Sequence, residues 1–331
     1  MEAIVISRPC VAILDDYEHL AEGSPSVATL RQFADVRLFQ ERIAPADLPG
    51  ALAGCDTLIA IRERTRFTPE LLASLTGVRH LAQTGAGVAH IDVKAATAQG
   101  IAVSVTPGGS AQAVAELTLA LLLAVVHRVA EGDRAIRAGQ WPPLLGAEVG
   151  GKTLGLIGLG TIGQDVARLA QAFGMRVLAW SPHLTPERAQ PHAAEAVALE
   201  ELLAQSDVVS IHIRLSDQTR GLLHYDRLRQ MKPGAVLINT SRGPIAPGGD
   251  LVRALQEGIL GGAGLDVFDQ EPLPPDHPIR SFANVVLTPH VGWTTRETYE
   301  RFFAAAVANV RAWAAGAPAN VLNPEVLQAG R

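Results

Sequence analysis

Residues 153–163 read TLGLIGLGTIG, and the fold of the chain can be inferred outward from them. An apolar run typical of a buried strand comes first, and glycines follow at positions 158, 160 and 163 before a helical run. Gly158 permits a tight turn, Gly160 lets the backbone approach a pyrophosphate, and Gly163 lets helix and strand pack closely. The helix N-terminus then offers free N–H groups to phosphates. The stretch predicts a dinucleotide-binding βαβ unit, against the alternative of a glycine-rich turn in another α/β protein.

Short apolar runs alternate with helical segments on both sides of this stretch. Such alternation predicts an α/β fold in which helices cover both faces of parallel sheets. The predicted strands are Val11–Leu14, Val36–Phe39, Thr57–Ile61, Arg79–Gln83, Ile101–Val105, Thr153–Ile157, Arg176–Trp180, Val208–His212, Ala235–Asn239, Ala263–Val267 and Val285–Leu287.

The chain has 331 residues, which at roughly 100–200 residues per domain predicts two domains. The turn Thr106-Pro107-Gly108-Gly109 marks the expected boundary. A long helix is expected over 110–132, and it is apolar nearly all round, so it should be buried. The chain is expected to pass between the two domains a second time near residues 290–295. The last helix, 296–315, has no strand after it and could fold back on the first domain.

Composition excludes several classes of protein. Lys and Arg number 28 and Asp and Glu 33, so a basic nucleic-acid surface is not expected. Cys10 and Cys55 are the two cysteines, too few for a disulfide framework, and they are expected to be reduced core thiols with no metal site. We see no signal peptide, and the longest apolar run is too short to span a bilayer. A cytoplasmic protein is expected.

Four polar residues fall at or beyond the carboxyl ends of predicted strands: Arg242, Asp266, Glu271 and His290. In open α/β sheets this edge binds ligands. The chemistry suits a 2-keto acid, because an Arg can hold the carboxylate and a His can protonate the alkoxide that hydride transfer creates. Glu271 would orient the imidazole and favour its charged form. Each residue alone could equally be an ordinary loop residue, so the prediction depends on their combination with the phosphate loop.

The strand that follows the phosphate loop ends at Ser181, where an NAD-binding sheet usually has Asp or Glu. A missing carboxylate removes the repulsion against a 2′-phosphate, and His183 and Arg188 could contact that phosphate. Ser181 could instead bind the ribose diol of NAD. The cofactor is therefore expected to be NAD or NADP, with NADP slightly favoured.

At this point the sequence resembles the D-isomer-specific 2-hydroxyacid dehydrogenase family over nearly the whole chain. That family includes glyoxylate/hydroxypyruvate reductases, D-lactate dehydrogenases and phosphoglycerate dehydrogenases. The matching stretches are Gln83–Asp92, Thr153–Gly163, Met231–Gly234, Asn239–Gly243, Leu265–Pro272 and Leu287–His290.

The resemblance implies two Rossmann-like domains, with the cofactor domain (106–295) inserted into a flavodoxin-like substrate domain (1–105 and 296–331). It implies a catalytic set of Arg242, Glu271 and His290. The backbone at Ala86 and Gly87, together with Arg242, would hold the substrate carboxylate. Thr161 and Ile162 would contact the pyrophosphate, and Thr240 and Asp266 would lie near the nicotinamide. Family members are usually dimers, so a homodimer is expected.

We therefore expect an NAD(P)-dependent oxidoreductase that interconverts a small 2-keto acid and a D-2-hydroxy acid, with His290 as the acid and base. A phosphoglycerate dehydrogenase-like enzyme of serine synthesis is the alternative within the family. A different class is also open, a non-catalytic dinucleotide sensor resembling the C-terminal binding co-repressors.

Overall fold

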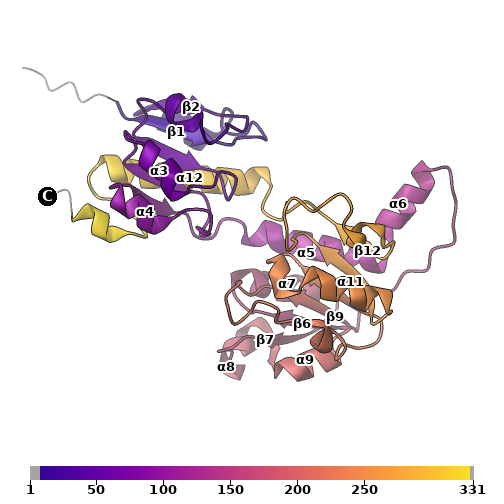
Figure 1. Ribbon diagram of the computed structural model, residues 1–331. Coiled ribbons are helices and arrows are strands. Elements are labelled where there is room, and N and C mark those ends of the chain that lie inside the picture. The colour runs from indigo at the N-terminus through magenta and orange to yellow at the C-terminus, as the bar shows by residue number, and fades with distance from the viewer. Residues whose placement is uncertain (1–7, 329–331) are drawn as a thin grey trace, which may run out of the picture. The chain divides into compact units, whose positions relative to one another are not determined.

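The computed structural model describes residues 8–328, and the chain divides into two compact units (Figure 1). Unit 1 comprises Met1–Ser110 and Thr294–Arg331, and unit 2 comprises Ala111–Trp293. From the sequence, the chain is predicted to pass from the substrate domain to the cofactor domain between residues 105 and 106 and to return between residues 295 and 296. Both units are α/β, and each contains its own parallel sheet.

Unit 1 is built on a five-stranded sheet of order β2-β1-β3-β4-β5, the flavodoxin-like order. All four pairings are parallel. Its strands are β1 (Cys10–Leu14), β2 (Asp35–Leu38), β3 (Thr57–Ala60), β4 (His80–Gln83) and β5 (Ala102–Val105). Its helices are α1 (Pro25–Leu30), α2 (Leu48–Ala51), α3 (Pro69–Ser74), α4 (Val93–Ala98), α12 (Arg296–Ala314) and the 3₁₀ turn Pro324–Leu327.

The last part of the chain completes unit 1. Helix α12 packs against α1 and β4, and the Glu300 carboxylate accepts hydrogen bonds from the hydroxyls of Ser24 and Ser26 at the start of α1. Beyond α12, Val321 forms an antiparallel bridge with Ser104 on β5. The Asn323 side chain accepts from the Val103 N–H at 2.8 Å and donates to a carbonyl of the same strand region. The free edge of β5 is therefore covered by this C-terminal segment.

Unit 2 is built on a seven-stranded sheet of order β12-β11-β10-β9-β6-β7-β8, and its pairings are parallel. Its strands are β6 (Thr153–Ile157), β7 (Arg176–Trp180), β8 (Glu195–Ala196), β9 (Val208–Ile211), β10 (Ala235–Asn239), β11 (Leu260–Leu265) and β12 (Val285–Leu287). Its helices are α5 (Ala111–Val126), α6 (Val129–Arg137), α7 (Thr161–Ala172), α8 (Pro186–Ala189), α9 (Leu199–Gln205), α10 (Tyr225–Leu228) and α11 (Gly248–Gln256). Short 3₁₀ turns cover Gln190–His192, Gly243–Ile245 and Pro278–Ser281.

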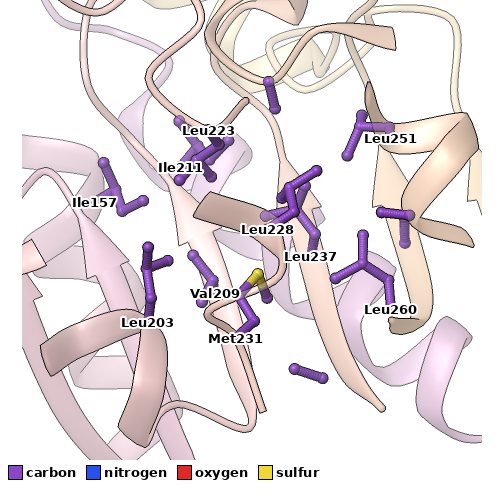
Figure 2. Packing of buried hydrophobic residues seen from close by; sticks show 14 of the residues in the cluster. Ile157, Leu203, Val209, Ile211, Leu223, Leu228, Met231, Leu237, Leu251 and Leu260 are labelled. Carbon is purple, nitrogen blue, oxygen red and sulfur yellow. The ribbon is translucent and has the colours of Figure 1, made fainter. Parts of the chain in front are cut away.

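Both faces of this sheet are covered by apolar side chains. Successive residues of a strand point to opposite faces, so Val236 joins one core cluster and Leu237 joins the other. Figure 2 shows the cluster that contains Leu237, where β9 and β10 meet side chains of α10 and α11. The other cluster contains the inner face of α5. Burial on both faces explains why these strands read as continuous Val, Ile and Leu runs.

The prediction of one long helix over 110–132 is wrong. The structure breaks it into α5 and α6, because Arg128 has a left-handed backbone with φ of 55°. One side of α5 is buried in unit 2, while Gln112, Glu116 and Ala120 on it are exposed. Helix α6 extends away from the sheet (Figure 1). Within residues 8–328, we find no single helix long and apolar enough to cross a bilayer. Helices α5 and α6 reach that length only as a pair bent by 64°.

His80 is a buried titratable group in the core of unit 1. Its ring is 1% exposed, stacks on Trp313 of α12, and has Nε2 at 2.8 Å from the Ser104 hydroxyl. Within the described part of the chain, Nδ1 has no hydrogen-bond partner. A proton on Nδ1 would therefore be buried and unpaired, and this burial lowers the pKa of His80 from 6.5 to about 4.

We predict that unit 1 loses stability as the pH falls from about 6.5 to about 4. Above that window His80 is neutral both folded and unfolded, and within it the unfolded chain binds the proton preferentially. A pKa lowered from 6.5 to about 4 corresponds to a loss of at most about 3 kcal/mol. Urea unfolding at several pH values measures it. The control is His80→Gln, which keeps an amide donor for Ser104. An identical pH dependence in both proteins would contradict the assignment.

Candidate active site

The phosphate loop joins β6 to α7 beside the point where the strand order reverses. Gly158 has φ of 107°, and a Cβ there would lie 2.6 Å from the carbonyl oxygen of His212. A Cβ on Gly163 would lie 2.1 Å from the carbonyl oxygen of Gly158. Both positions therefore require glycine, because the loop, the helix and the neighbouring strand end lie in backbone contact. These are the close approaches that the sequence predicts for residues 158 and 163.

Gly160 is the N-cap of α7, and a Cβ at this position would meet no atom within 4 Å. The space beside the loop is therefore open, and the first N–H groups of α7, at Thr161 and Ile162, begin there. An open glycine cradle at a helix N-terminus suits a pyrophosphate. The residues present thus fit a dinucleotide.

Two further residues expected near the cofactor occupy the same edge of the sheet. Ser181 directly follows β7 and is half-buried, and its carbonyl accepts from the Leu184 N–H. The nearby Arg188 guanidinium donates to the His183 carbonyl at 2.9 Å. Thr240 follows β10, and its hydroxyl lies 3.0 Å from the Thr118 hydroxyl on α5. Their contacts with a nicotinamide nucleotide remain predictions.

Arg242 begins the turn after β10. The Asn239 side chain donates to the Arg242 carbonyl at 3.0 Å and accepts from the Ser241 N–H, so β10 fixes the turn. The Ser241 hydroxyl donates to the Ile213 carbonyl at 2.6 Å and ties the turn to the neighbouring strand end. These bonds fix the backbone from which the Arg242 guanidinium extends.

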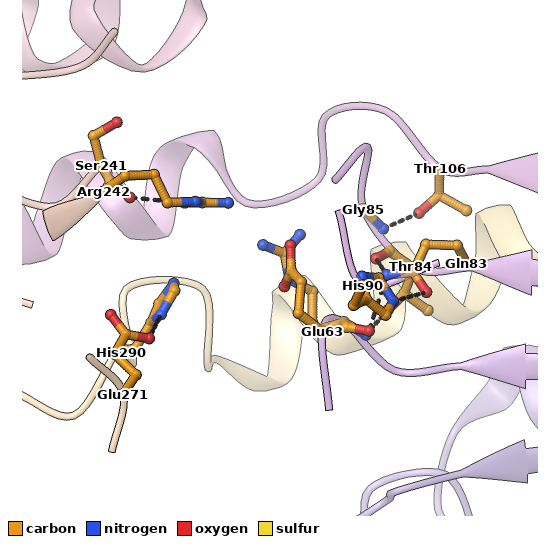
Figure 3. A network of polar contacts seen from close by, with 11 residues as sticks. Glu63, Gln83, Thr84, Gly85, His90, Thr106, Ser241, Arg242, Glu271 and His290 are labelled. Atoms are coloured by element: carbon orange, nitrogen blue, oxygen red, sulfur yellow. Dashed lines mark hydrogen bonds and ion pairs between the residues drawn. The ribbon is translucent and has the colours of Figure 1, made fainter. Parts of the chain in front are cut away.

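Glu271 and His290 form a hydrogen-bonded pair (Figure 3). The distance from His290 Nδ1 to Glu271 Oε2 is 2.7 Å, and Glu271 Oε1 accepts from the Phe268 N–H at 2.9 Å. Burial raises the pKa of Glu271. This effect is outweighed by the hydrogen bond and charge of His290, by the Phe268 N–H and by the charge of Arg242, so the pKa of Glu271 lies below its ordinary value. The carboxylate is therefore ionised near neutral pH. Within unit 2, Glu271 thus interacts with His290 through a hydrogen bond and with the charge of Arg242. That the three residues form one catalytic site stays a prediction.

Asp266 fixes the turn that carries His290. Its carboxylate is 1% exposed and accepts from the Thr288 hydroxyl at 2.6 Å, the Val291 N–H at 2.8 Å and the Gly292 N–H at 2.9 Å. His290 itself has a left-handed backbone with φ of 55°, which costs a non-glycine residue free energy. The buried carboxylate stabilises this conformation from both sides. Sequence reasoning placed Asp266 near the nicotinamide and missed this role, because its partners lie 22 to 26 residues away.

Unit 1 supplies a separate loop after β4. Gly85 has φ of 84°, donates to the Thr106 hydroxyl at 2.6 Å, and accepts from the Thr106 N–H. Ala86 is exposed and Gly87 is half-buried. In the described residues, neither N–H donates to a protein acceptor. Two backbone donors held on an anchored turn can bind an anion such as a carboxylate.

Sequence reasoning also missed the residues that hold this loop. The Gln83 amide donates to the carbonyls of Arg62 and Thr84, and His90 Nε2 lies 3.2 Å from Gln83 Oε1 (Figure 3). The Thr84 hydroxyl accepts from the Arg62 N–H at 2.8 Å. A buried glutamine at the end of a strand was the available signal, because a buried amide must have hydrogen-bond partners.

Among residues 8–328, no group of three or more His, Cys, Asp or Glu side chains could hold a metal ion.

Comparisons of the sequence and of the structure with known proteins all point to relatives of one dehydrogenase family. Residues 119–292 match the profile described as D-isomer specific 2-hydroxyacid dehydrogenase, NAD binding domain. The chain is 44% identical to a glyoxylate reductase of Aeropyrum pernix over 80% of this chain and 82% of that protein. It is 37% identical to a D-3-phosphoglycerate dehydrogenase of Archaeoglobus fulgidus, over 72% of this chain but only 46% of that protein. The solved structure of a glyoxylate reductase from Paecilomyes thermophila matches with a TM-score of 0.79 and 31% identity, over 96% of this chain and 99% of that one.

We predict that Gly163→Ala destabilises unit 2, because its Cβ would meet a backbone oxygen that cannot move freely. The free energy of unfolding should fall by about 1–3 kcal/mol, and NADH binding should weaken with it. Gly160→Ala is the matched control, since its Cβ meets open space. It should keep the free energy of unfolding within about 1 kcal/mol of the wild-type value. It should still weaken NADH binding, because the methyl group would enter the open space that suits a pyrophosphate. Urea unfolding and nicotinamide fluorescence measure both. Equal stability of the two variants would contradict the packing argument.

Proposed function

The chain belongs to the D-isomer-specific 2-hydroxyacid dehydrogenase family, and from this premise we propose that it reduces a small 2-keto acid to the D-2-hydroxy acid, or catalyses the reverse. Membership makes the chain an oxidoreductase with an NAD-binding domain. The observation that carries the finer proposal is the 2.7 Å hydrogen bond between His290 Nδ1 and Glu271 Oε2.

His290 is the proposed acid and base. Its Nδ1 is engaged by Glu271, so Nε2 is the nitrogen left to exchange a proton with substrate. When bound, the nicotinamide supplies or accepts the hydride. As the substrate carbonyl becomes an alkoxide, Nε2 of the imidazolium gives it a proton, and in the reverse direction it removes the hydroxyl proton. Because the pKa of Glu271 is lowered, its carboxylate stays negative and stabilises the imidazolium.

The substrate carboxylate would be held by backbone and guanidinium donors. Arg242 has the planar donor geometry that binds carboxylates in two hydrogen bonds. Ala86 and Gly87 offer backbone N–H groups on the anchored loop of unit 1. Binding through backbone donors fixes the carboxylate without reading the substrate side chain.

Glyoxylate or hydroxypyruvate is the preferred substrate class. The chain covers 82% of the Aeropyrum pernix glyoxylate reductase at 44% identity. A phosphoglycerate dehydrogenase-like activity is the second candidate, supported by 37% identity to the Archaeoglobus fulgidus enzyme, although the chain spans less than half of that protein. A dinucleotide-sensing scaffold would bind cofactor without turnover.

NADP is slightly favoured over NAD as the cofactor. The proposal depends on Ser181, which follows β7 where a carboxylate would repel a 2′-phosphate. Arg188 lies close by and could approach such a phosphate, since its guanidinium is exposed.

The homodimer and the cytoplasmic location stay predictions. Unit 2 does expose apolar side chains on and after α6, and Trp141 is 90% exposed. An exposed apolar surface of this kind suits a second copy of the chain.

We predict that His290→Ala lowers kcat/KM for keto-acid reduction by at least about 10²-fold and leaves cofactor binding intact, because it removes the proton donor. Absorbance of the nicotinamide measures turnover on glyoxylate, hydroxypyruvate, pyruvate, phosphohydroxypyruvate and bulkier 2-keto acids. His224→Ala, at an exposed histidine of the same unit, is the control. Retained turnover in His290→Ala would refute the assignment. Fastest turnover of phosphohydroxypyruvate would favour the second candidate, and cofactor binding without turnover of any keto acid would favour the scaffold.

We predict that Ser181→Asp shifts cofactor preference toward NADH. The new carboxylate would repel a 2′-phosphate and accept from a ribose diol, changing the NADPH-to-NADH ratio of kcat/KM by about tenfold, or about 1.4 kcal/mol. Ser181→Ala separates this charge effect from loss of the hydroxyl. An unchanged ratio in Ser181→Asp would show that this residue does not set cofactor choice.

A further inference from the structure

Strand pairing holds the two cysteines of unit 1 side by side. Cys10 begins β1, and Cys55 lies two residues before β3. These strands pair in parallel with Val11 opposite Thr57. Asp56 adds to the connection, because its N–H donates to the Cys10 carbonyl at 3.1 Å and its carboxylate accepts from the Cys10 N–H at 3.2 Å. The backbone around both cysteines is thus fixed by hydrogen bonds.

The two sulfur atoms are in direct contact. Cys10 Sγ lies 2.7 Å from Cys55 Sγ, and both residues are free thiols. Joining two cysteines usually requires that their backbones already lie close with the side chains directed at each other. That condition is met here. Cys10 is half-buried and so reachable from solvent, whereas Cys55 is 1% exposed.

We propose that Cys10 and Cys55 form a reversible intramolecular disulfide, with a low-molecular-weight disulfide as the oxidant. The Cys10 thiolate attacks one sulfur of the small disulfide, whose S–S bond breaks and releases one thiol. Cys55 then gives its proton to solvent and attacks the Cys10 sulfur, the mixed disulfide breaks, and a second small thiol leaves. The pair loses two electrons and two protons, and the small disulfide is reduced to two thiols.

The environment sets the order of these steps. Burial, and to a smaller extent the neighbouring Cys10, raises the pKa of the Cys55 thiol to about 12. Cys55 therefore stays protonated, and the half-exposed Cys10 reacts first. Cys55 attacks once Cys10 has become the electrophile beside it.

The bond would stabilise unit 1 without touching the proposed chemistry. It would join residues 45 positions apart, so it would restrict the unfolded chain strongly. Cys10 lies at the amino end of its strand, whereas the Gly85–His90 loop follows the carboxyl end of β4. In a parallel sheet these are opposite edges, so the proposal is independent of the proposed function.

The experiment uses the whole wild-type chain under native conditions. Reduced protein is incubated with oxidised glutathione, then analysed by intact mass, thiol titration and non-reducing peptide mapping. We expect loss of both thiols together, a mass lower by about 2 Da, and a Cys10–Cys55 linked peptide. The melting temperature should rise by about 5 °C or more and return on adding dithiothreitol.

Single serine variants test the order of reaction. Cys55→Ser should accept a stable glutathione adduct on Cys10, and Cys10→Ser should stay unmodified over the same time. The proposal is overturned if wild-type protein keeps two titratable thiols, takes two adducts, links two chains, or reacts only in denaturant. Each of these outcomes is read on the wild-type chain, so failure of a variant to fold does not decide the test.

Discussion

Parallel pairing of the strands is the constraint on which the functional residues depend. Because parallel strands all point the same way, their carboxyl ends lie along one edge of each sheet. In unit 2 that edge presents the phosphate loop after β6, Arg242 after β10 and His290 after β12. In unit 1 the corresponding edge presents the Gly85–His90 loop after β4. Residues far apart in sequence lie at the same edge of a sheet because each follows the carboxyl end of a parallel strand. The crossover helices that parallel pairing requires cover the two faces of the sheet.

The carboxylate of Asp266 fixes the turn that carries His290. A carboxylate in an apolar interior is unfavourable unless donors surround it, and Asp266 obtains three from the segment around His290. That segment includes a backbone conformation that histidine seldom adopts. In the structure the left-handed turn and the three bonds to Asp266 occur together, so the bonds offset the cost of the backbone conformation. His290 is thereby held against Glu271, which would reduce reorganisation in the proton transfer proposed above.

The sequence was informative where local chemistry decides the structure. Gly158 and Gly163 of the phosphate loop were predictable because their roles follow from backbone contacts. Apolar runs predicted most of the strands because their residues are buried on both faces of the sheet. Strand β8 was missed since it has two residues and no apolar run. The break between α5 and α6 was missed because nothing in the apolar pattern marks the left-handed Arg128. The partners of Asp266, and the bonds from Gln83 that hold the Gly85–His90 loop, depend on contacts between distant segments, which spacing alone does not reveal.

The return of α12 to unit 1 has a consequence for the order in which the protein is made. Unit 2 is one continuous stretch, so the ribosome delivers all of its strands before it delivers α12. The first five strands, by contrast, emerge early, but His80 still lacks the ring of Trp313 and the edge of β5 lacks Val321 and Asn323. During synthesis the domain that starts first is therefore completed last. Until Val321 and Asn323 arrive, the uncovered edge of β5 is a template for unwanted strand pairing.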